Sequence, residues 1–317
     1  MRHKDYLPKG VIPATLLAFN DDYSIDEKAT QAHLEFVGGV PGIDAVTVNG
    51  HSTEGHACSL DEQKRLLDLA GDAIGDRLPL ISGIYADGSL EASRIARMAD
   101  EASASCLLVF PPSTIGWGGM QQRPEAALAH FKHIANATDL PLILFQYQGE
   151  YAYPTDTLLR LVEEIPSIKA IKDWSPPIQH QNNIHLLQNL PRPVNVLSTN
   201  SAWLMASLGM GCKGLLSGAG SVIADLQVAL FNAVQDNDYA RAKQIHKRIL
   251  PTSQVFYADP FGDMHNRMKE ALVILGRMPR AVVRPPLVKL TDAEIETVRQ
   301  ALELADVSGD GAVGIAT

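Results

Sequence analysis

The sequence predicts a (β/α)8 barrel, and three observations lead to that fold class. Short apolar runs alternate with amphipathic helical patterns along most of the chain. Eight such strand–helix units fit within about 215 residues, a length that suits a barrel of this kind. No G-x-G-x-x-G segment follows the first apolar run, so the main alternative, a doubly wound open sheet, has less support.

The expected strands are short apolar runs, as in parallel sheets that are buried on both faces. In chain order they are Val11–Leu17, Ile43–Val48, Leu78–Gly83, Ser105–Phe110, Pro141–Phe145, Ile168–Lys172, Val194–Leu197 and Lys213–Leu216. The stretches between them repeat apolar residues at helical spacing. The expected helices include Ser24–Val37, Asp61–Asp72, Leu90–Glu101, Ala126–Ala137 and Asp156–Ile165. Asp61 and Thr155–Asp156 are predicted to cap their helices, because short polar side chains accept the free N–H groups there.

After Ser217–Gly220 the strand pattern stops and helical patterns continue. These later helices are expected over Ala224–Gln235, Tyr239–Tyr257, Met264–Leu275 and Asp292–Leu304. We therefore predict a barrel over residues 1–223 and a helical segment over 224–306 that is an appendage of the barrel. The small, Gly-rich tail 307–317 is predicted to be disordered.

The composition excludes several classes of protein. The formal net charge is −9 and no Lys/Arg-rich run occurs, so a nucleic-acid partner is not expected. No apolar segment approaches the ~18 residues that span a bilayer, and the N-terminus lacks an apolar signal region. The three cysteines form no C-x-x-C pair, so neither disulfides nor a zinc site are expected. A soluble cytoplasmic protein is the expectation.

Lys172 is the most informative residue. It stands at the C-terminal end of the strand pattern Ile168–Lys172, where side chains of a parallel barrel point into the ligand pocket. Partial burial lowers the pKa of such an amine and leaves it able to attack a ketone carbonyl. The alternative is a structural lysine that pairs with Asp173 or with a helix end.

Several segments form a set with a defined order and spacing. They are Gly50-His51-Ser52-Thr53-Glu54, Ser59-Leu60-Asp61-Glu62, Ile171-Lys172-Asp173, Gly211-Cys212-Lys213-Gly214-Leu215-Leu216-Ser217, Met268-Lys269-Glu270-Ala271-Leu272 and Arg284-Pro285-Pro286-Leu287. Together they resemble the dihydrodipicolinate synthase/N-acetylneuraminate lyase family of class I pyruvate aldolases. The resemblance runs roughly from Gly10 to Leu287. Thr53 replaces the second glycine of the family's G-x-[ST]-G-E motif, so the match there is partial.

The resemblance implies that Lys172 is a Schiff-base lysine that needs no metal or other cofactor. It also implies a substrate-binding loop at Gly50–Thr53, in which Ser52 and successive N–H groups can hold a carboxylate. Ser217 and Gly218 are then expected to shape the pocket around a 2-keto acid such as pyruvate or a 2-keto-3-deoxy acid. The enamine formed on Lys172 can make or break a C–C bond with an aldehyde, or eliminate water. A homotetramer or homodimer is the assembly that the family implies.

One departure from the family concerns acid–base chemistry. The family carries a proton-shuttling tyrosine at the end of the fifth strand, in a Y-N-x-P motif, and the aligned residue here is Phe145. A phenyl ring cannot transfer protons, so another group is needed. Tyr147 faces the same way as Phe145 because it lies two residues further along a strand. His51 is the second candidate, since an unperturbed imidazole titrates near neutral pH.

Further departures concern the substrate. Glu150 stands where dihydrodipicolinate synthases carry an arginine for a second carboxylate, and Pro111–Thr114 offers no tyrosine after the fourth strand. Lysine biosynthesis is therefore disfavoured. Sialic acid cleavage is disfavoured too, because Phe145 replaces the tyrosine that it would use. Rings are expected at the pocket mouth, where they favour an apolar aldehyde or a sugar face. These rings are Trp117, Phe145, Tyr147, Tyr151, Tyr153 and Trp174.

Two hypotheses about function follow. The first is a class I lyase, either an aldolase or a dehydratase, that acts on a 2-keto acid through an enamine on Lys172. The second is a catalytically silent relative that binds a keto acid or sugar acid as a sensor or structural subunit, and Phe145 is the feature that favours it. A metal site at His51, His56 and Glu54 is set aside because no second cluster completes a ligand set. His180 and His185 are expected on a solvated helix start.

Overall fold

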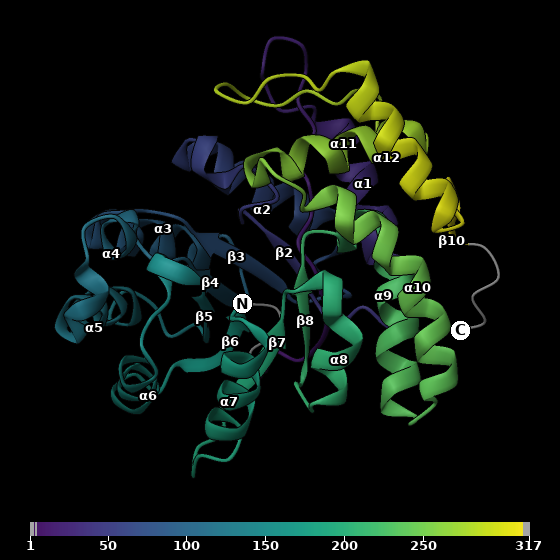
Figure 1. Cartoon of the computed structure of the whole chain (residues 1–317). Coiled ribbons are helices and arrows are strands. Elements are labelled where there is room, and N and C mark those ends of the chain that lie inside the picture. The colour runs from purple at the N-terminus through teal and green to yellow at the C-terminus, as the bar shows by residue number, and fades with distance from the viewer. Residues whose placement is uncertain (1–2, 4, 313–317) are drawn as a thin grey trace.

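The computed structural model describes residues 3 and 5–312 and contains a barrel of parallel strands (Figure 1). The strands are hydrogen-bonded in the order β1-β8-β7-β6-β5-β4-β3-β2. Two isolated bridges, Val11–Ile43 and Ala14–Thr47, connect the ends of this sheet and nearly close the barrel. The strands are β1 Gly10–Pro13, β2 Val46–Val48, β3 Leu80–Ile84, β4 Cys106–Val109, β5 Leu142–Gln146, β6 Ile168–Asp173, β7 Asn195–Ser198 and β8 Gly214–Ser217. The predicted (β/α)8 fold is confirmed, and each predicted strand overlaps an observed one.

Each strand is followed by a helix on the outside of the barrel. These helices are α1 Glu27–Gly38, α2 Leu60–Ile74, α3 Ser89–Glu101, α5 Pro124–Ala135, α6 Thr155–Glu164, α7 Pro177–Leu187, α8 Leu204–Gly209 and α9 Gly220–Gln235. Because α9 packs against both β8 and β1, it completes the helical layer of the barrel. The predicted boundary between residues 223 and 224 therefore falls within α9, whose last residue is Gln235. Short helices occupy the loops: η1 Gly55–Ala57, α4 Ser113–Gly116, η2 Met120–Gln122, η3 Gly149–Tyr151, η4 Ser201–Trp203 and η5 Phe261–Asp263.

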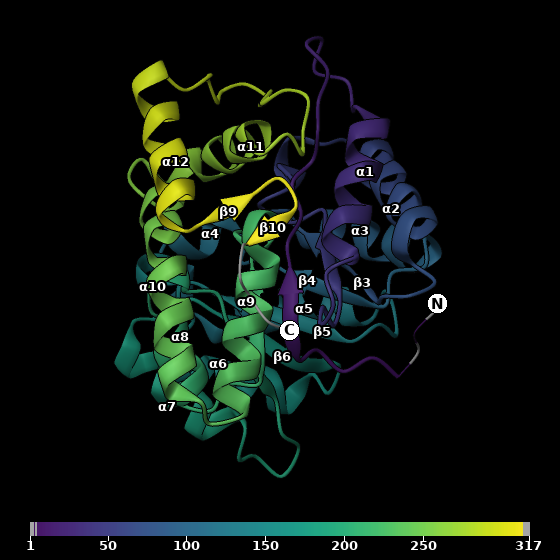
Figure 2. The same ribbon diagram turned by 90° about the vertical axis from the view of Figure 1, so that its right-hand side faces the viewer.

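The appendage consists of α10 Tyr239–Phe256, α11 Met264–Ile274 and α12 Asp292–Leu304. Figures 1 and 2 both show α10 running beside α9, and α10 also packs on α12 and on η4 in the loop after β7. The appendage therefore reaches the end of the barrel at which the strands finish. Among the described residues, no helix combines the length and the apolar character that crossing a membrane requires.

The C-terminal tail is ordered over residues 307–312. Strands β9 Val307–Ser308 and β10 Gly311–Ala312 pair antiparallel, and Figure 2 shows this hairpin against α9. The Arg277 side chain donates hydrogen bonds to the carbonyl oxygens of Ser308 and Gly309, at 2.6 and 2.9 Å. This part of the tail, for which disorder is predicted from the sequence, forms a hairpin in the structure, and an arginine distant in sequence contacts it. The rest of the predicted tail, residues 313–317, lies outside the described residues.

The core has two layers, as expected for a barrel wrapped by helices. Inside the barrel, Ile12, Ile81, Ile143, Leu197 and Leu216 are buried against one another, and Phe145 caps them toward the mouth. A larger cluster fills the space between the strands and the helices. The strands are therefore mostly apolar on both faces, with exceptions such as Thr47 of β2 and Ser82 of β3, so a charged side chain at the end of a strand is conspicuous.

The cap of α2 differs from the prediction. The hydroxyl of Ser59 accepts a hydrogen bond from the Glu62 N–H, while the Glu62 carboxylate accepts one from the Ser59 N–H. This reciprocal capping box places Asp61 in the first turn of the helix. The predicted cap at Thr155 is likewise one residue late, since Pro154 precedes the first residue of α6.

Candidate active site

Lys172 projects into a cavity at the C-terminal mouth of the barrel. It belongs to β6 and pairs across the sheet with Phe145 of β5 and Leu197 of β7. Its side chain is 7% exposed, and burial lowers its pKa to about 7. Within the described residues its Nζ atom has no hydrogen-bond or ion-pair partner; it lies 4.0 Å from the centre of the Phe145 ring. A large fraction of this amine is therefore unprotonated at neutral pH.

The cavity has a volume of about 290 Å³ and gathers most of the predicted site residues. Those that line it are His51, Ser52, Phe145, Tyr147, Lys172 and Gly218. Gly50, Thr53 and Ser217 do not line it, although all three lie in the loops or strand ends around it. The sequence motifs and the cavity thus coincide at one end of the barrel.

The loop after β2 can hold a carboxylate through its backbone. The Thr53 hydroxyl donates to the Gly50 carbonyl oxygen at 2.9 Å, so this side chain braces the loop. Within residues 3 and 5–312, neither the Ser52 N–H nor the Thr53 N–H has a hydrogen-bond acceptor. A Cβ atom on Gly218 would lie 2.6 Å from the Ser52 Oγ, so glycine is needed there for the two loops to approach. Two free N–H groups and one hydroxyl are therefore available beside the cavity.

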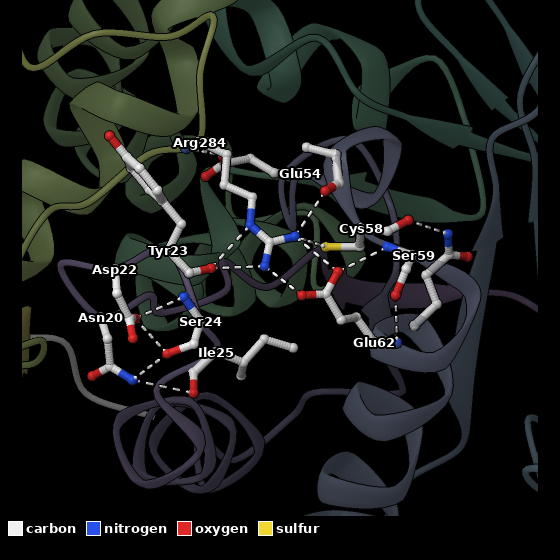
Figure 3. Close-up of polar contacts among 12 residues, drawn as sticks. Asn20, Asp22, Tyr23, Ser24, Ile25, Glu54, Cys58, Ser59, Glu62 and Arg284 are labelled. Carbon is white, nitrogen blue, oxygen red and sulfur yellow. Dashed lines mark hydrogen bonds and ion pairs between the residues drawn. The ribbon is translucent and has the colours of Figure 1, made fainter.

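Glu54 fixes this loop to the appendage. Its backbone is left-handed, with φ of 53°, and its buried carboxylate accepts hydrogen bonds from Lys269 Nζ at 2.5 Å and from the Arg284 N–H at 2.9 Å. Figure 3 shows the Arg284 guanidinium between the Glu62 carboxylate and the Tyr23 carbonyl oxygen. The guanidinium lowers the pKa of Glu62 to about 2. Lys269 and Arg284, which belong to the family-like segments near the C-terminus, therefore hold the loop after β2 and do not line the cavity.

Phe145 and Tyr147 form a continuous pair of rings beside Lys172. Their ring centres are 4.2 Å apart, and both residues line the cavity, as their spacing on a strand predicts. Burial raises the pKa of the Tyr147 hydroxyl well above its ordinary value, so this hydroxyl stays protonated at neutral pH. Tyr147 can therefore donate a proton, but it is a poor base.

His51 is neutral in this site. Burial, with the nearby His56 and Lys172 as further causes, lowers its pKa to about 3. Its ring contacts Tyr85, Phe261 and His265, with centre distances of 6.3, 6.3 and 4.9 Å. The unperturbed titration assumed from the sequence therefore does not apply to His51. Among the described residues, no group of three or more His, Cys, Asp or Glu side chains is arranged to hold a metal ion.

The rings expected at the mouth divide into two groups. Trp174 joins Phe145 and Tyr147 in the cavity lining. Tyr151 lies further out, 6.1 Å from Tyr147 between ring centres. Tyr153 is buried between barrel and helices against Phe131, and Trp117 is 74% exposed. The expectation that Trp117 and Tyr153 belong to the mouth is wrong, because their loops carry them away from it.

A buried charge pair lies behind Lys172. The Asp173 carboxylate accepts hydrogen bonds from His180 Nδ1 and Asn183 Nδ2, each at 2.9 Å. Burial acts to lower the pKa of His180, but Asp173 outweighs it and raises that pKa to about 9. The expectation of a solvated His180 is wrong; the residue fastens α7 to the end of β6. One feature of the sequence could have indicated this pair. Asp173 directly follows Lys172, and neighbours on a strand point to opposite sides, so a lysine that faces the cavity places Asp173 toward the surrounding helices, where it needs a partner.

The appendage contributes side chains that sequence reasoning missed. Ser253, Gln254 and Tyr257 from α10 and its C-terminal cap line the cavity, with Phe261 and Met264 beyond them. Ser253 and Tyr257 are four residues apart, so they share one helix face. That spacing is visible in the sequence, but nothing local shows that this face meets the barrel mouth.

Comparisons with known proteins identify relatives of this chain. The sequence profile of the Dihydrodipicolinate synthetase family matches residues 7–305. The chain is 30% identical over 270 residues to 4-hydroxy-tetrahydrodipicolinate synthase of Kineococcus radiotolerans, covering 84% of this chain and 83% of the relative. It is 28% identical over 302 residues to the synthase of Dechloromonas aromatica, covering 93% and 98%.

A solved structure shows the same fold. The chain superposes with a TM-score of 0.86 on YagE, a prophage protein of E. coli K12 from the dihydrodipicolinic acid synthase family, crystallised with pyruvate. The two share 23% sequence identity, and the match covers 95% of this chain and 99% of YagE.

Proposed function

Because this chain belongs to the Dihydrodipicolinate synthetase family, we propose that it is a Schiff-base-forming lyase acting on a 2-keto acid through Lys172. The observation that carries the proposal is the state of the Lys172 amine. This amine faces the cavity, has a pKa of about 7 and has no hydrogen-bond or ion-pair partner among the described residues. A buried amine without a partner costs folding free energy, so its presence is best explained by chemistry.

The site supports a complete first half of the reaction. Ser52 and the N–H groups of Ser52 and Thr53 bind the substrate carboxylate, and the neutral Lys172 amine attacks the adjacent keto carbon. Water leaves, and a protonated imine forms. Loss of a C3 proton to solvent then gives an enamine. Alternatively, the C4 hydroxyl loses its proton to solvent as the C3–C4 bond breaks, which gives the enamine and releases an aldehyde. In a dehydration, the enamine formed by loss of the C3 proton expels the C4 hydroxyl, which takes a proton from Tyr147 and leaves as water.

The acid–base group remains a choice between two residues that line the cavity. Tyr147 is favoured because its hydroxyl is protonated at neutral pH and can donate to the departing water. His51 is neutral and has a pKa of about 3, which makes it a hydrogen-bond partner for the substrate more than a base. We propose Tyr147 as the acid and His51 as a substrate-binding residue.

The relatives named as 4-hydroxy-tetrahydrodipicolinate synthases do not fix the substrate of this chain. Glu150 is exposed outside the cavity, and among the described lining residues Lys172 is the one side chain that can carry a positive charge at neutral pH. We therefore propose a substrate with one carboxylate. Assembly into a homodimer or homotetramer is a further proposal from the family, which light scattering of the purified protein tests.

The second candidate is a catalytically silent binder. Phe145 favours it, because this ring occupies the place of the family's proton-shuttling tyrosine directly beside Lys172. A silent binder needs no neutral amine in the cavity, so the two candidates differ in whether Lys172 reacts.

Borohydride trapping separates them. The protein is incubated with pyruvate and sodium borohydride, digested, and the peptide containing Lys172 is analysed by mass spectrometry. A reduced pyruvyl adduct on Lys172 supports the lyase. Lys169→Ala, which alters a lysine on the same strand, is the matched control and should retain the adduct. The absence of an adduct with pyruvate and with larger 2-keto acids would overturn the proposal.

A further inference from the structure

The strand that carries Lys172 ends in a second buried ionisable residue. Asp173 directly follows Lys172 on β6, and neighbours on a strand point to opposite faces, so its carboxylate lies outside the barrel wall. This carboxylate is 1% exposed and accepts hydrogen bonds from the Ser175 N–H at 3.0 Å and from His180 Nδ1 and Asn183 Nδ2 at 2.9 Å. Burial acts to raise its pKa, but these partners outweigh burial and lower the pKa. A negative charge is therefore buried one residue away from the reactive amine.

An uncompensated charge on Asp173 would act on the amine of Lys172. Side-chain ends on opposite faces of one strand lie roughly 10 Å apart, and at that separation a buried carboxylate raises the pKa of an amine by about one unit. A smaller fraction of the amine would then be neutral at pH 7, and the neutral form is the one that attacks a carbonyl. A cation placed against Asp173 cancels this effect.

The hydrogen bonds of His180 indicate that it supplies this cation. Its Nδ1 donates to the Asp173 carboxylate, and its Nε2 lies 2.6 Å from the Ser207 hydroxyl. That hydroxyl lies 3.5 Å from the thiol of Cys212, and the thiol donates to the Gly214 carbonyl oxygen at 3.4 Å. Because the thiol and the hydroxyl each have one hydrogen, Ser207 donates to Cys212 and must accept from His180 Nε2. All these contacts are satisfied together only when both ring nitrogens carry hydrogen, so that His180 is an imidazolium.

The surroundings of His180 agree with a charged ring. Among the described residues, the titratable groups that act on it are Asp173 of β6 and Cys212 of the segment before β8. Burial acts to lower the pKa of His180, but these two groups outweigh burial and raise it to about 9. The Trp203 ring of η4 covers the imidazole edge-on, with ring centres 5.2 Å apart. Within the part of the chain that the structure describes, no second cation pairs with Asp173, so its neutralisation depends on His180.

The groups on the cavity side of Lys172 carry no charge of their own. His51 has a pKa of about 3 and is neutral, whereas burial raises the pKa of Tyr147 and of Tyr257, so both hydroxyls stay protonated at pH 7. These are the other titratable side chains among the described residues that line the cavity. The buried charges next to Lys172 are therefore those on the outer face of β6.

We propose that His180 is a positioning residue for the reaction at Lys172, and that it acts by neutralising the Asp173 carboxylate across β6. This inference rests on the proposed Schiff base at Lys172, whose amine must be neutral to attack. His180 does not line the cavity, so it acts through Asp173 and not through the substrate. The pair holds α7 against the end of β6 without drawing a proton onto the nucleophile.

The pH profile of pyruvate C3 proton exchange for deuterium, followed by NMR, tests the inference. His180→Asn keeps a donor near the Nδ1 position but removes the positive charge. We expect the midpoint of its profile to rise by about one pH unit from the wild-type value near 7, so that exchange at pH 6 falls about tenfold. The double variant Asp173→Asn/His180→Asn has neither charge and should return to the wild-type midpoint. His185→Asn, at an exposed histidine of the same helix, is the matched control.

The midpoint separates this role from a merely structural one. His180→Asn also loses the contact with Ser207, which can change the rate but does not move the titration of Lys172. An unchanged midpoint in folded His180→Asn overturns the inference. A midpoint as high in the double variant as in the single one also overturns it, because charge would not be the cause. Thermal melting shows which variants are folded.

Nitrogen NMR of the wild-type histidine rings makes the inference testable even if the variants do not fold. At pH 7.5 we expect both ring nitrogens of His180 to carry protons, whereas a neutral ring overturns the inference. This measurement does not depend on catalysis. If the wild type exchanges no C3 protons of pyruvate at any pH, the proposed Schiff base fails, and with it the role of His180 in the reaction, whatever its protonation.

Discussion

Lys172 and Lys269 are both buried, but they have different surroundings. Lys269 belongs to α11, and its Nζ donates to the Glu54 carboxylate at 2.5 Å and to the Val282 carbonyl oxygen at 2.7 Å. Lys172 lies at the barrel mouth over the Phe145 ring, with no carboxylate partner among the described residues. Burial lowers the pKa of both amines, and only for Lys269 does the charge of Glu54 act against it.

The difference shows what decides the role of a buried lysine. A carboxylate partner keeps the amine charged, so the lysine has a structural role as half of an ion pair. Without a partner the amine loses its proton near neutral pH and becomes a nucleophile.

The following predictions test this contrast. The exchange of pyruvate C3 protons for deuterium, followed by NMR, serves as the assay because it requires the imine and the enamine but no second substrate.

Substitution of Lys172 should have the largest effect. Lys172→Ala removes the nucleophile, so we expect C3 exchange to fall by roughly 10³-fold or more. The melting temperature at pH 7 should not fall, because the Nζ atom makes no hydrogen bond or ion pair. Lys169→Ala is the control. Exchange that continued at the wild-type rate in Lys172→Ala would refute the assignment of the nucleophile.

Substitution of Lys269 should act on stability instead. Lys269→Met leaves the Glu54 carboxylate buried without its cation, which costs about 3–5 kcal/mol in the free energy of unfolding. Urea denaturation measures this change. The double variant Glu54→Gln/Lys269→Met should recover part of the loss, since no unpaired charge remains. Equal stability of Lys269→Met and the wild type would show that the Lys269–Glu54 ion pair does not stabilise the fold.

Tyr147→Phe tests whether the Tyr147 hydroxyl is the acid that serves the reaction at Lys172. This change keeps the ring and removes the hydroxyl, so we expect C3 exchange to fall by about 10²-fold, the lower end of the range for acid–base groups. Tyr151→Phe, the next ring outward, is the matched control and should change exchange little. If Tyr147→Phe exchanges as fast as the wild type, another group transfers the proton.

The pH dependence should give the smallest but most direct signal. Since burial lowers the pKa of Lys172 to about 7, exchange at low pyruvate should rise about tenfold per pH unit below pH 7 and level off above it. A rise continuing toward pH 10 would indicate an unperturbed lysine.

Between about pH 7 and 10.5 the unfolded state holds a proton that folded Lys172 has lost. The contribution of Lys172 to stability therefore increases with pH in this window, and Lys172→Met should lack this increase.

The sequence was sufficient for the barrel and for the prediction that several candidate residues from the barrel lie around one cavity. Strands of this sheet are mostly apolar on both faces, so a lysine at the end of Ile168–Lys172 was visible as an exception. His51, Ser52, Phe145 and Tyr147 could be placed because each follows or ends a strand. Such residues meet at one end of any barrel, whatever the details of packing.

The other half of the site depends on tertiary packing. Ser253 and Tyr257 belong to a helix whose neighbours, α9 and η4, are fixed by the whole fold, so no local pattern reveals where they point. The burial of His180 depends in the same way on Asp173 across the β6–α7 connection. The order of residues 307–312 depends on Arg277, some 30 positions earlier. Each of these features depends on a contact between segments that are separate in sequence.

The tie at Glu54 has a consequence for the synthesis of the chain. Glu54 is 215 residues from Lys269 and 230 from Arg284, and it braces the loop that carries Ser52. Chains emerge from the ribosome N-terminal end first, so all eight barrel strands and Lys172 are made before either partner of Glu54. A nascent chain thus contains Lys172 while the loop after β2, which carries Ser52, still lacks its contacts with Lys269 and Arg284. The contacts of Glu54 can form only after Lys269 and Arg284 have left the ribosome.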